Sequence, residues 1–293
     1  MLRLVLFFST NIAVLLILGI VCKVLGIDQR LAMSGQSLPG LLLMAGVIGM
    51  LGSFISLATS KWIAKRTTGA RVIDTPRDAT EVWLKDTVAR QAHAVGIGTP
   101  EIAIFDSPEL NAFATGMNKN NALVAVSVGL LRGMQKEEVE AVLAHEISHV
   151  ANGDMVTMGL VQGVLNTFVI FVSRLIASVV DGMLRRGSTG GASPIYFIVS
   201  MVMQVVLGLL ASIIAMWFSR WREFRADAGS AKLVGKDKMI AALERLRAQH
   251  APVMLPREIE AMGISGDMGH GLKRLFMSHP PLEERIQALR QAA

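Results

Sequence analysis

The sequence is poor in charged and aromatic residues. Only 18% of its 293 residues are Asp, Glu, Lys or Arg, and 5% are aromatic, whereas soluble domains carry about 25% charged residues. The single cysteine, Cys22, excludes a disulfide within the chain, so nothing indicates an oxidising compartment. The sequence also lacks a basic surface interleaved with aromatic residues, and we therefore expect no nucleic-acid partner.

Long uncharged apolar runs are what the chain has in excess. They cover residues 4–22, 31–60, 155–173 and 191–219. Each run reaches the roughly 18–20 residues that an α-helix needs to cross a bilayer. A buried core helix is the alternative for any single run, but four of them indicate an integral membrane protein. The first run is too long for a secretory signal and is followed by Lys23, so we interpret it as a retained anchor.

Basic residues follow two of these runs and suggest the orientation of the chain. They are Lys61, Lys65, Arg66 and Arg71 after the second run, and Arg220, Arg222 and Arg225 after the fourth. Such flanks usually stay in the cytoplasm. The positive charges at residues 174, 185 and 186 oppose this bias for the third and fourth runs. The sequence therefore leaves open whether that hairpin crosses the bilayer fully.

The polar residues form two stretches, 61–154 and 220–293, on either side of the segment 155–219. Each stretch alone is short for a domain, but together they are long enough to form one hydrophobic core. The pattern of the first stretch predicts helices at 81–95 and 136–152 and strands at 101–105 and 121–128. That of the second predicts helices at 222–233, 238–250 and 281–291. The expected fold class is an integral membrane α-helical protein with about four transmembrane helices and a mostly α, α+β cytoplasmic domain.

The strongest local signal is the sequence His145-Glu146-Ile147-Ser148-His149, inside the predicted helix 136–152. Four residues advance a helix by about one turn, so both imidazoles leave the same face. Two neutral imidazole nitrogens at this spacing can share one Zn²⁺, and the adjacent Glu146 is placed to take a proton from water on that metal.

A catalytic zinc takes three protein ligands, so a third is required. Glu223 is the best candidate, and Asp227, four residues later, is suited to accept the second N–H of a ligand histidine. The alternative is an exposed helix whose acids pair with neighbouring arginines. Two predicted crossings separate His149 from Glu223, which returns both halves of the site to the same side, close to the membrane surface.

Five segments together resemble the HtpX-type membrane proteases, gluzincin relatives of the CAAX prenyl endoproteases. They are residues 111–116 (NAFATG), 126–131 (VSVGLL), 145–154 (HEISHVANGD), 219–227 (SRWREFRAD) and 278–285 (SHPPLEER). The resemblance implies one zinc per chain and a zincin catalytic domain. It also implies cleavage of misfolded or damaged membrane proteins at the cytoplasmic face of the bacterial inner membrane, as protein quality control under stress.

This interpretation divides the chain into four parts. Residues 1–60 form two N-terminal transmembrane helices, and 61–154 the first part of the catalytic domain. Residues 155–219 form a transmembrane or membrane-associated hairpin, and 220–293 the second part of the catalytic domain, with the third ligand. The expected partners are the lipid bilayer and unfolded or membrane protein substrates.

The expected mechanism uses Glu146 as general base, while zinc polarises the scissile carbonyl. The oxyanion needs a further donor, for which His279 is the candidate and Arg285 the second choice. A strand such as residues 123–128 would bind an extended substrate at its edge, unless it is an ordinary core strand.

Two other function classes are weaker, a membrane zinc transporter or sensor and a membrane scaffold with a structural zinc. A zinc transporter would carry metal-binding pairs inside its spans, and a structural zinc would need a fourth ligand. The alternative within the enzymes is a CAAX-type prenyl-protein endopeptidase, for which four spans are too few to build the intramembrane chamber.

Overall fold

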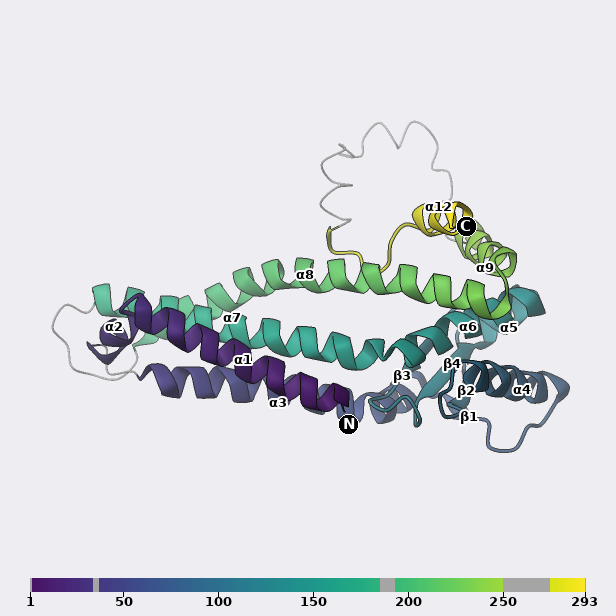
Figure 1. Cartoon of the computed structure of the whole chain (residues 1–293), viewed down its shortest axis with the longest axis horizontal. Helices are drawn as coiled ribbons and strands as arrows, with labels where there is room; N and C mark the ends of the chain where they lie inside the picture. The colour runs from purple at the N-terminus through teal and green to yellow at the C-terminus, as the bar shows by residue number, and fades with distance from the viewer. Residues whose placement is uncertain (1, 34–36, 185–192, 250–274, 293) are drawn as a thin grey trace. The chain divides into compact units, whose positions relative to one another are not determined.

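A computed structural model describes residues 2–33, 37–184, 193–249 and 275–292 (Figure 1). The chain forms two compact units, each made of two separate stretches of sequence. The first unit comprises Met1–Leu57 and Val156–Ala215, and the second Ala58–Met155 and Met216–Ala293.

The first unit is built of apolar helices. These are α1 (Leu2–Val24), α2 (Ile27–Met33), the first part of α3 (Leu38–Thr68), most of α7 (Asp154–Leu184) and the first part of α8 (Pro194–Val234). By length and composition, three described helices can cross a membrane, namely α3, α7 and α8, and α1 contains a shorter apolar stretch, Phe8–Val24. The expected class of helical membrane protein is confirmed.

A close helix contact shows how tightly this unit packs. A methyl group added at Gly49 on α3 would lie 2.8 Å from the Cα of Thr167 on α7. The absence of a side chain at Gly49 therefore allows the two backbones to approach. α7 also continues beyond its uncharged run, so that Arg174 and Asp181 lie within the helix.

The second unit contains a four-stranded sheet in the order β1-β2-β4-β3. The strands are β1 (Arg71–Val72), β2 (Glu101–Phe105), β3 (Ala112–Thr115) and β4 (Leu123–Ser127). β2 and β4 are parallel, and the two outer pairings are antiparallel. Because β4 is central and every one of its residues is buried, the hypothesis that residues 123–128 present an edge to substrate is wrong.

Helices from both polar stretches complete the second unit. They are α4 (Ala79–Ala94), α5 (Val128–Gly133), α6 (Lys136–Asn152), α9 (Lys236–Gln249) and α12 (Leu282–Gln291). One apolar core joins them, with Leu84, Leu143, Met239 and Ile286 among its buried members. The predictions of α4, α6, α9, α12, β2 and β4 are confirmed to within about two residues; His250, the last residue of the predicted helix 238–250, lies outside the described part. The predicted helix 222–233 is the end of α8.

Candidate metal centre

The helix α6 is fixed at both ends by its own sequence. At its start, the backbone N–H of Gln135 donates to the carboxylate of Glu138 at 2.8 Å, as in a capping box. At its end, Gly153 takes a left-handed conformation (φ 69°) and its N–H bonds back to carbonyls of the last turn. The helix is buried from Ala141 to Val150, so its polar face, with His145 and His149, points into protein instead of water.

A close crossing brings α8 against α6. A methyl group added at Gly229 on α8 would lie 2.7 Å from the Cβ of Ser148, so only glycine permits this approach. The hydroxyl of Ser230 donates to the carbonyl of Ala141 at 2.8 Å, next to the crossing. Glu223 lies nearly two turns before Gly229 on α8 and is thereby brought to the histidines of α6.

The three predicted metal ligands converge. Ligand atoms of His145, His149 and Glu223 all lie within 4.8 Å of one another, and all three residues are buried. The two Nε2 atoms are 3.1 Å apart. Oε1 of Glu223 lies 3.3 Å from Nε2 of His149, and Oε2 lies 3.5 Å from Nε2 of His145.

The other nitrogen of each imidazole faces a buried carboxylate. Nδ1 of His149 lies 2.7 Å from Oδ2 of Asp154, which is 2% exposed. Nδ1 of His145 lies 3.0 Å from Oδ1 of Asp227, although the two groups are not aligned as a hydrogen bond. Both rings thus direct Nε2 toward Glu223. Two nitrogens and one carboxylate oxygen, each nitrogen backed by an acid, are a donor set that fits a divalent transition metal.

The buried acids raise the basicity of both rings. Burial opposes the imidazolium form, but hydrogen bonds to Asp154 and Glu223 outweigh it and raise the pKa of His149 to about 10. The pKa of His145 is also raised, because Asp227 and Glu223 outweigh burial. The negative charge that stabilises the imidazolium form at this place also favours a bound cation.

Two residues of the C-terminal stretch complete the surroundings. Arg285, with a side chain only 7% exposed, donates to both carboxylate oxygens of Asp227, at 2.8 and 2.6 Å. Its third nitrogen is 3.4 Å from Oε2 of Glu223. Nδ1 of His279 is 2.8 Å from the same oxygen, while its side chain remains 64% exposed. His279 therefore reaches the site from the solvent side, and Arg285 from the protein side.

Glu146 follows His145 on α6 and is buried, with 9% of its surface exposed. It adds negative charge next to His149. Its carboxylate stands on the same helix as His145 and His149.

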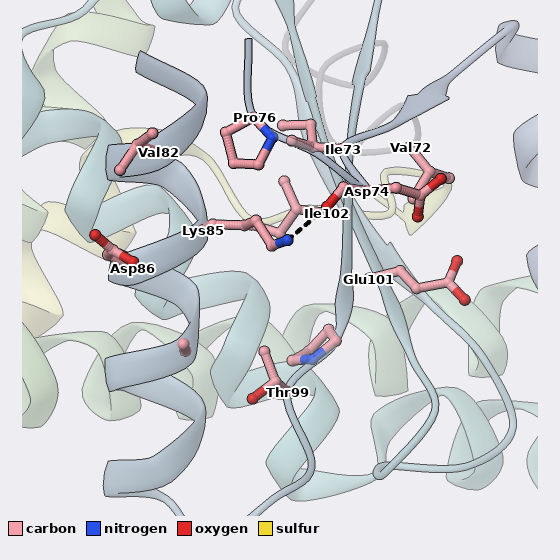
Figure 2. Close-up of a pocket in the computed structure, with 12 residues that line it drawn as sticks. Val72, Ile73, Asp74, Pro76, Val82, Lys85, Asp86, Thr99, Glu101 and Ile102 are labelled. Atoms are coloured by element: carbon pink, nitrogen blue, oxygen red, sulfur yellow. Dashed lines mark hydrogen bonds between the residues drawn. The ribbon is translucent and has the colours of Figure 1, made fainter. Parts of the chain in front are cut away.

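A separate pocket of about 520 Å³ lies between α4 and the strands β1 and β2 (Figure 2). In the figure, Lys85 extends across it and donates to the backbone carbonyl of Asp74 at 2.8 Å. None of the residues that line it belongs to the cluster around Glu223, so this pocket is not the place where the metal-site chemistry occurs.

Comparisons with known proteins identify the family of the chain. The model of peptidase family M48 matches residues 78–293. Protease HtpX homolog of Nitrosomonas europaea is 60% identical over 292 residues, 99% of each chain. Protease HtpX of Xanthomonas campestris pv. campestris is 59% identical over 288 residues, 98% of this chain and 97% of the relative. The chain belongs to peptidase family M48, among its HtpX proteases.

A solved structure shows that the fold of this M48 chain is also shared more widely. Ste24p of S. mikatae superimposes with a TM-score of 0.65, covering 97% of this chain and 67% of Ste24p, at 21% identity. Family membership and membrane-capable helices together make the chain a membrane metalloprotease.

Sequence reasoning assigned no role in this M48 site to Asp154, although it noted the motif 145–154. A usable signal was present: Asp154 directly follows the glycine that ends α6, and a chain that turns there returns its next residue to the last helical turn. The contact of Gly229 with Ser148 had no such local signal.

Proposed function

We propose that this chain is a zinc endopeptidase. The support is the cluster of two imidazoles and one carboxylate within 4.8 Å, with Glu146 on the same helix. Two nitrogen donors and one oxygen donor suit zinc, and three protein ligands leave a position for water, as in catalytic zinc sites. When bound, zinc supplies a Lewis acid that polarises the scissile carbonyl and acidifies water.

The residues of the chain then have separate tasks. His145, His149 and Glu223 hold the metal, while Asp154 and Asp227 orient the two imidazoles. Glu146 takes the proton from the attacking water and delivers it to the leaving amine. Arg285 acts as a positioning residue, because its guanidinium is occupied by Asp227, and it is less suited to oxyanion binding than the exposed His279.

Substrate binding is assigned to β3 instead of β4. β3 is an outer strand of the sheet, only partly buried, and it packs against α6. An extended peptide added along such an edge is held by main-chain hydrogen bonds, which do not demand one sequence. This tolerance suits an enzyme that acts on misfolded or damaged membrane proteins.

The proposed location is the cytoplasmic face of the bacterial inner membrane. It is supported by the basic residues that follow the apolar parts of α3 and α8. We infer that the enzyme takes part in protein quality control there.

The test is a Glu146→Gln variant of the full chain in detergent, assayed with casein as an unfolded substrate. Removing the general base is expected to lower the cleavage rate about 10²–10⁴-fold. Bound zinc, measured by metal analysis, should stay at one per chain. Glu137→Gln, an exposed glutamate on the same helix, is the matched control and should cleave normally.

Two results would contradict the proposal. Unchanged cleavage by Glu146→Gln would show that Glu146 is not the general base. Cleavage of a farnesylated CAAX peptide, with no cleavage of casein, would favour the prenyl-protein endopeptidase instead.

A further inference from the structure

Three of the four tryptophans lie at the ends of the apolar parts of α3 and α8. Trp62 follows the uncharged run of α3 by two residues, and Trp217 and Trp221 lie at the end of that of α8. Their exposed fractions are 64%, 62% and 48%. A large exposed indole is unfavourable in water, but its apolar body and polar N–H suit the boundary between membrane and water.

Two of these tryptophans are followed by an arginine one helical turn later. The guanidinium of Arg66 lies 5.7 Å from the ring centroid of Trp62, and that of Arg225 lies 4.9 Å from the ring of Trp221. The spacing of four residues places each pair on one face of its helix. The same Trp-x-x-x-Arg arrangement therefore occurs on two different helices of the second unit.

The basic residues around these pairs are already engaged with the protein. Lys61 and Lys65 both bind the carboxylate of Glu101. Arg222 donates to the carbonyl of Asp154 at 3.2 Å, and Arg220 to that of Met277 at 2.8 Å.

Arg66 and Arg225 differ from them. Both are exposed, and within the part of the chain that the structure describes neither has an acidic partner. An aromatic face holds each guanidinium in place without neutralising its charge. Each pair thus offers a positioned cation beside an interfacial indole.

We propose that Trp62–Arg66 and Trp221–Arg225 are two contact sites for the headgroup phosphates of anionic phospholipids. The occupant follows from position and charge. Both pairs stand on helices that can enter a membrane, where phosphate lies at the level that indole prefers. A guanidinium binds phosphate oxygens with two parallel hydrogen bonds, and its positive charge favours lipids that carry a net negative charge, which an uncharged indole does not. Lys61 and Lys65 take no part, because Glu101 occupies them.

The experiment measures lipid preference on the full chain through its own tryptophan fluorescence. The chain is reconstituted in phosphatidylcholine bilayers that contain brominated phosphatidylglycerol or, for comparison, brominated phosphatidylcholine. Quenching gives the relative binding constant of the two lipids at the protein surface. The variant is Arg66→Gln with Arg225→Gln, and the control is Arg247→Gln with Arg290→Gln, which removes two exposed charges from α9 and α12.

The wild-type chain should prefer phosphatidylglycerol, and the preference should fall about fivefold for each of Arg66 and Arg225 removed, as expected for one basic side chain at an anionic surface. Arg66→Lys with Arg225→Lys keeps the charge and should retain most of the preference. The control variant should behave as wild type, and added salt should weaken the preference.

Three outcomes would overturn the proposal. The first is an unchanged preference in the glutamine variant, and the second is an equal loss in the control. The third is loss of the wild-type preference when inorganic phosphate replaces chloride at constant ionic strength, because the pairs would then bind free phosphate instead of a lipid surface.

Discussion

The two histidines that we propose as metal ligands lie one turn apart on α6, yet they are supported in different ways. His149 is supported by Asp154, five residues further along the same chain and across one left-handed glycine. His145 is supported by Asp227 from α8, and Asp227 is held in turn by Arg285 from α12. The part of the proposed metal site around His149 and Asp154, the local half, is therefore formed by neighbouring residues. The part around His145, Asp227 and Arg285, the remote half, needs three distant segments to assemble.

The two halves therefore form under different conditions. The local half depends on the helix and its cap, so it forms whenever α6 forms. The remote half forms only when the C-terminal stretch has packed, because Asp227 and Arg285 are both buried and charged and neither is stable there without the other. Variants on the two sides should accordingly fail in different ways.

The largest effect is expected from Glu223→Ala, because Glu223 touches both halves. Structural zinc sites with four ligands bind with about 10–16 kcal/mol, so losing one ligand should weaken affinity on the order of 10³-fold. Metal content after gel filtration is the measurement. An unaltered zinc content would reassign the third ligand and make the comparison of the two halves meaningless.

Arg285→Met should break the remote half alone. It leaves the buried carboxylate of Asp227 without its guanidinium, which costs about 3–5 kcal/mol of stability. Chemical unfolding of the purified chain, followed by circular dichroism, measures the loss. Arg290→Met, on the same helix but 62% exposed, is the control and should change stability little. Equal stability of both variants would show that the remote half does not depend on this ion pair.

Asp154→Asn should weaken the local half while preserving the fold. The amide keeps the size of the side chain but loses the charge that orients His149, so zinc affinity should fall about 10–100-fold. Competition with a metal chelator measures the affinity, and the unfolding transition should stay in place. A large loss of stability with normal zinc affinity would assign Asp154 a structural role instead.

The smallest effect is expected from Gly153→Ala. Alanine in the left-handed conformation of Gly153 costs about 1–2 kcal/mol. Because the turn also delivers Asp154, zinc affinity should fall slightly along with stability. Gly208→Ala, at a helical position where a methyl group meets nothing, serves as the control. If Gly153→Ala left both quantities unchanged, the cap would not be needed to hold the local half.

The same division explains what the sequence predicted and what it did not. The spacing of His145 and His149 and the start and end of α6 are properties of neighbouring residues, and the structure has them where they were expected. Glu223 was proposed because a third ligand was needed, and the structure brings it to the histidines. The contacts of Arg285 with Asp227 and of Gly229 with Ser148 join segments that no periodicity connects. β1 and β3 are too short to leave an alternating pattern, so the place of β4 between β2 and β3 was not predictable.

The crossing at Gly229 has a consequence for the alignment of the two helices. Glu223 and Asp227 are spaced by one turn of α8, as His145 and His149 are spaced by one turn of α6. Sliding α8 along its axis by one turn, about 5.4 Å, would therefore present Asp227 where Glu223 belongs. The contact of Gly229 with Ser148 and the hydrogen bond of Ser230 to Ala141 can form at only one alignment of the two helices. The small residues Gly229 and Ser230 thus determine which carboxylate of α8 faces the imidazoles.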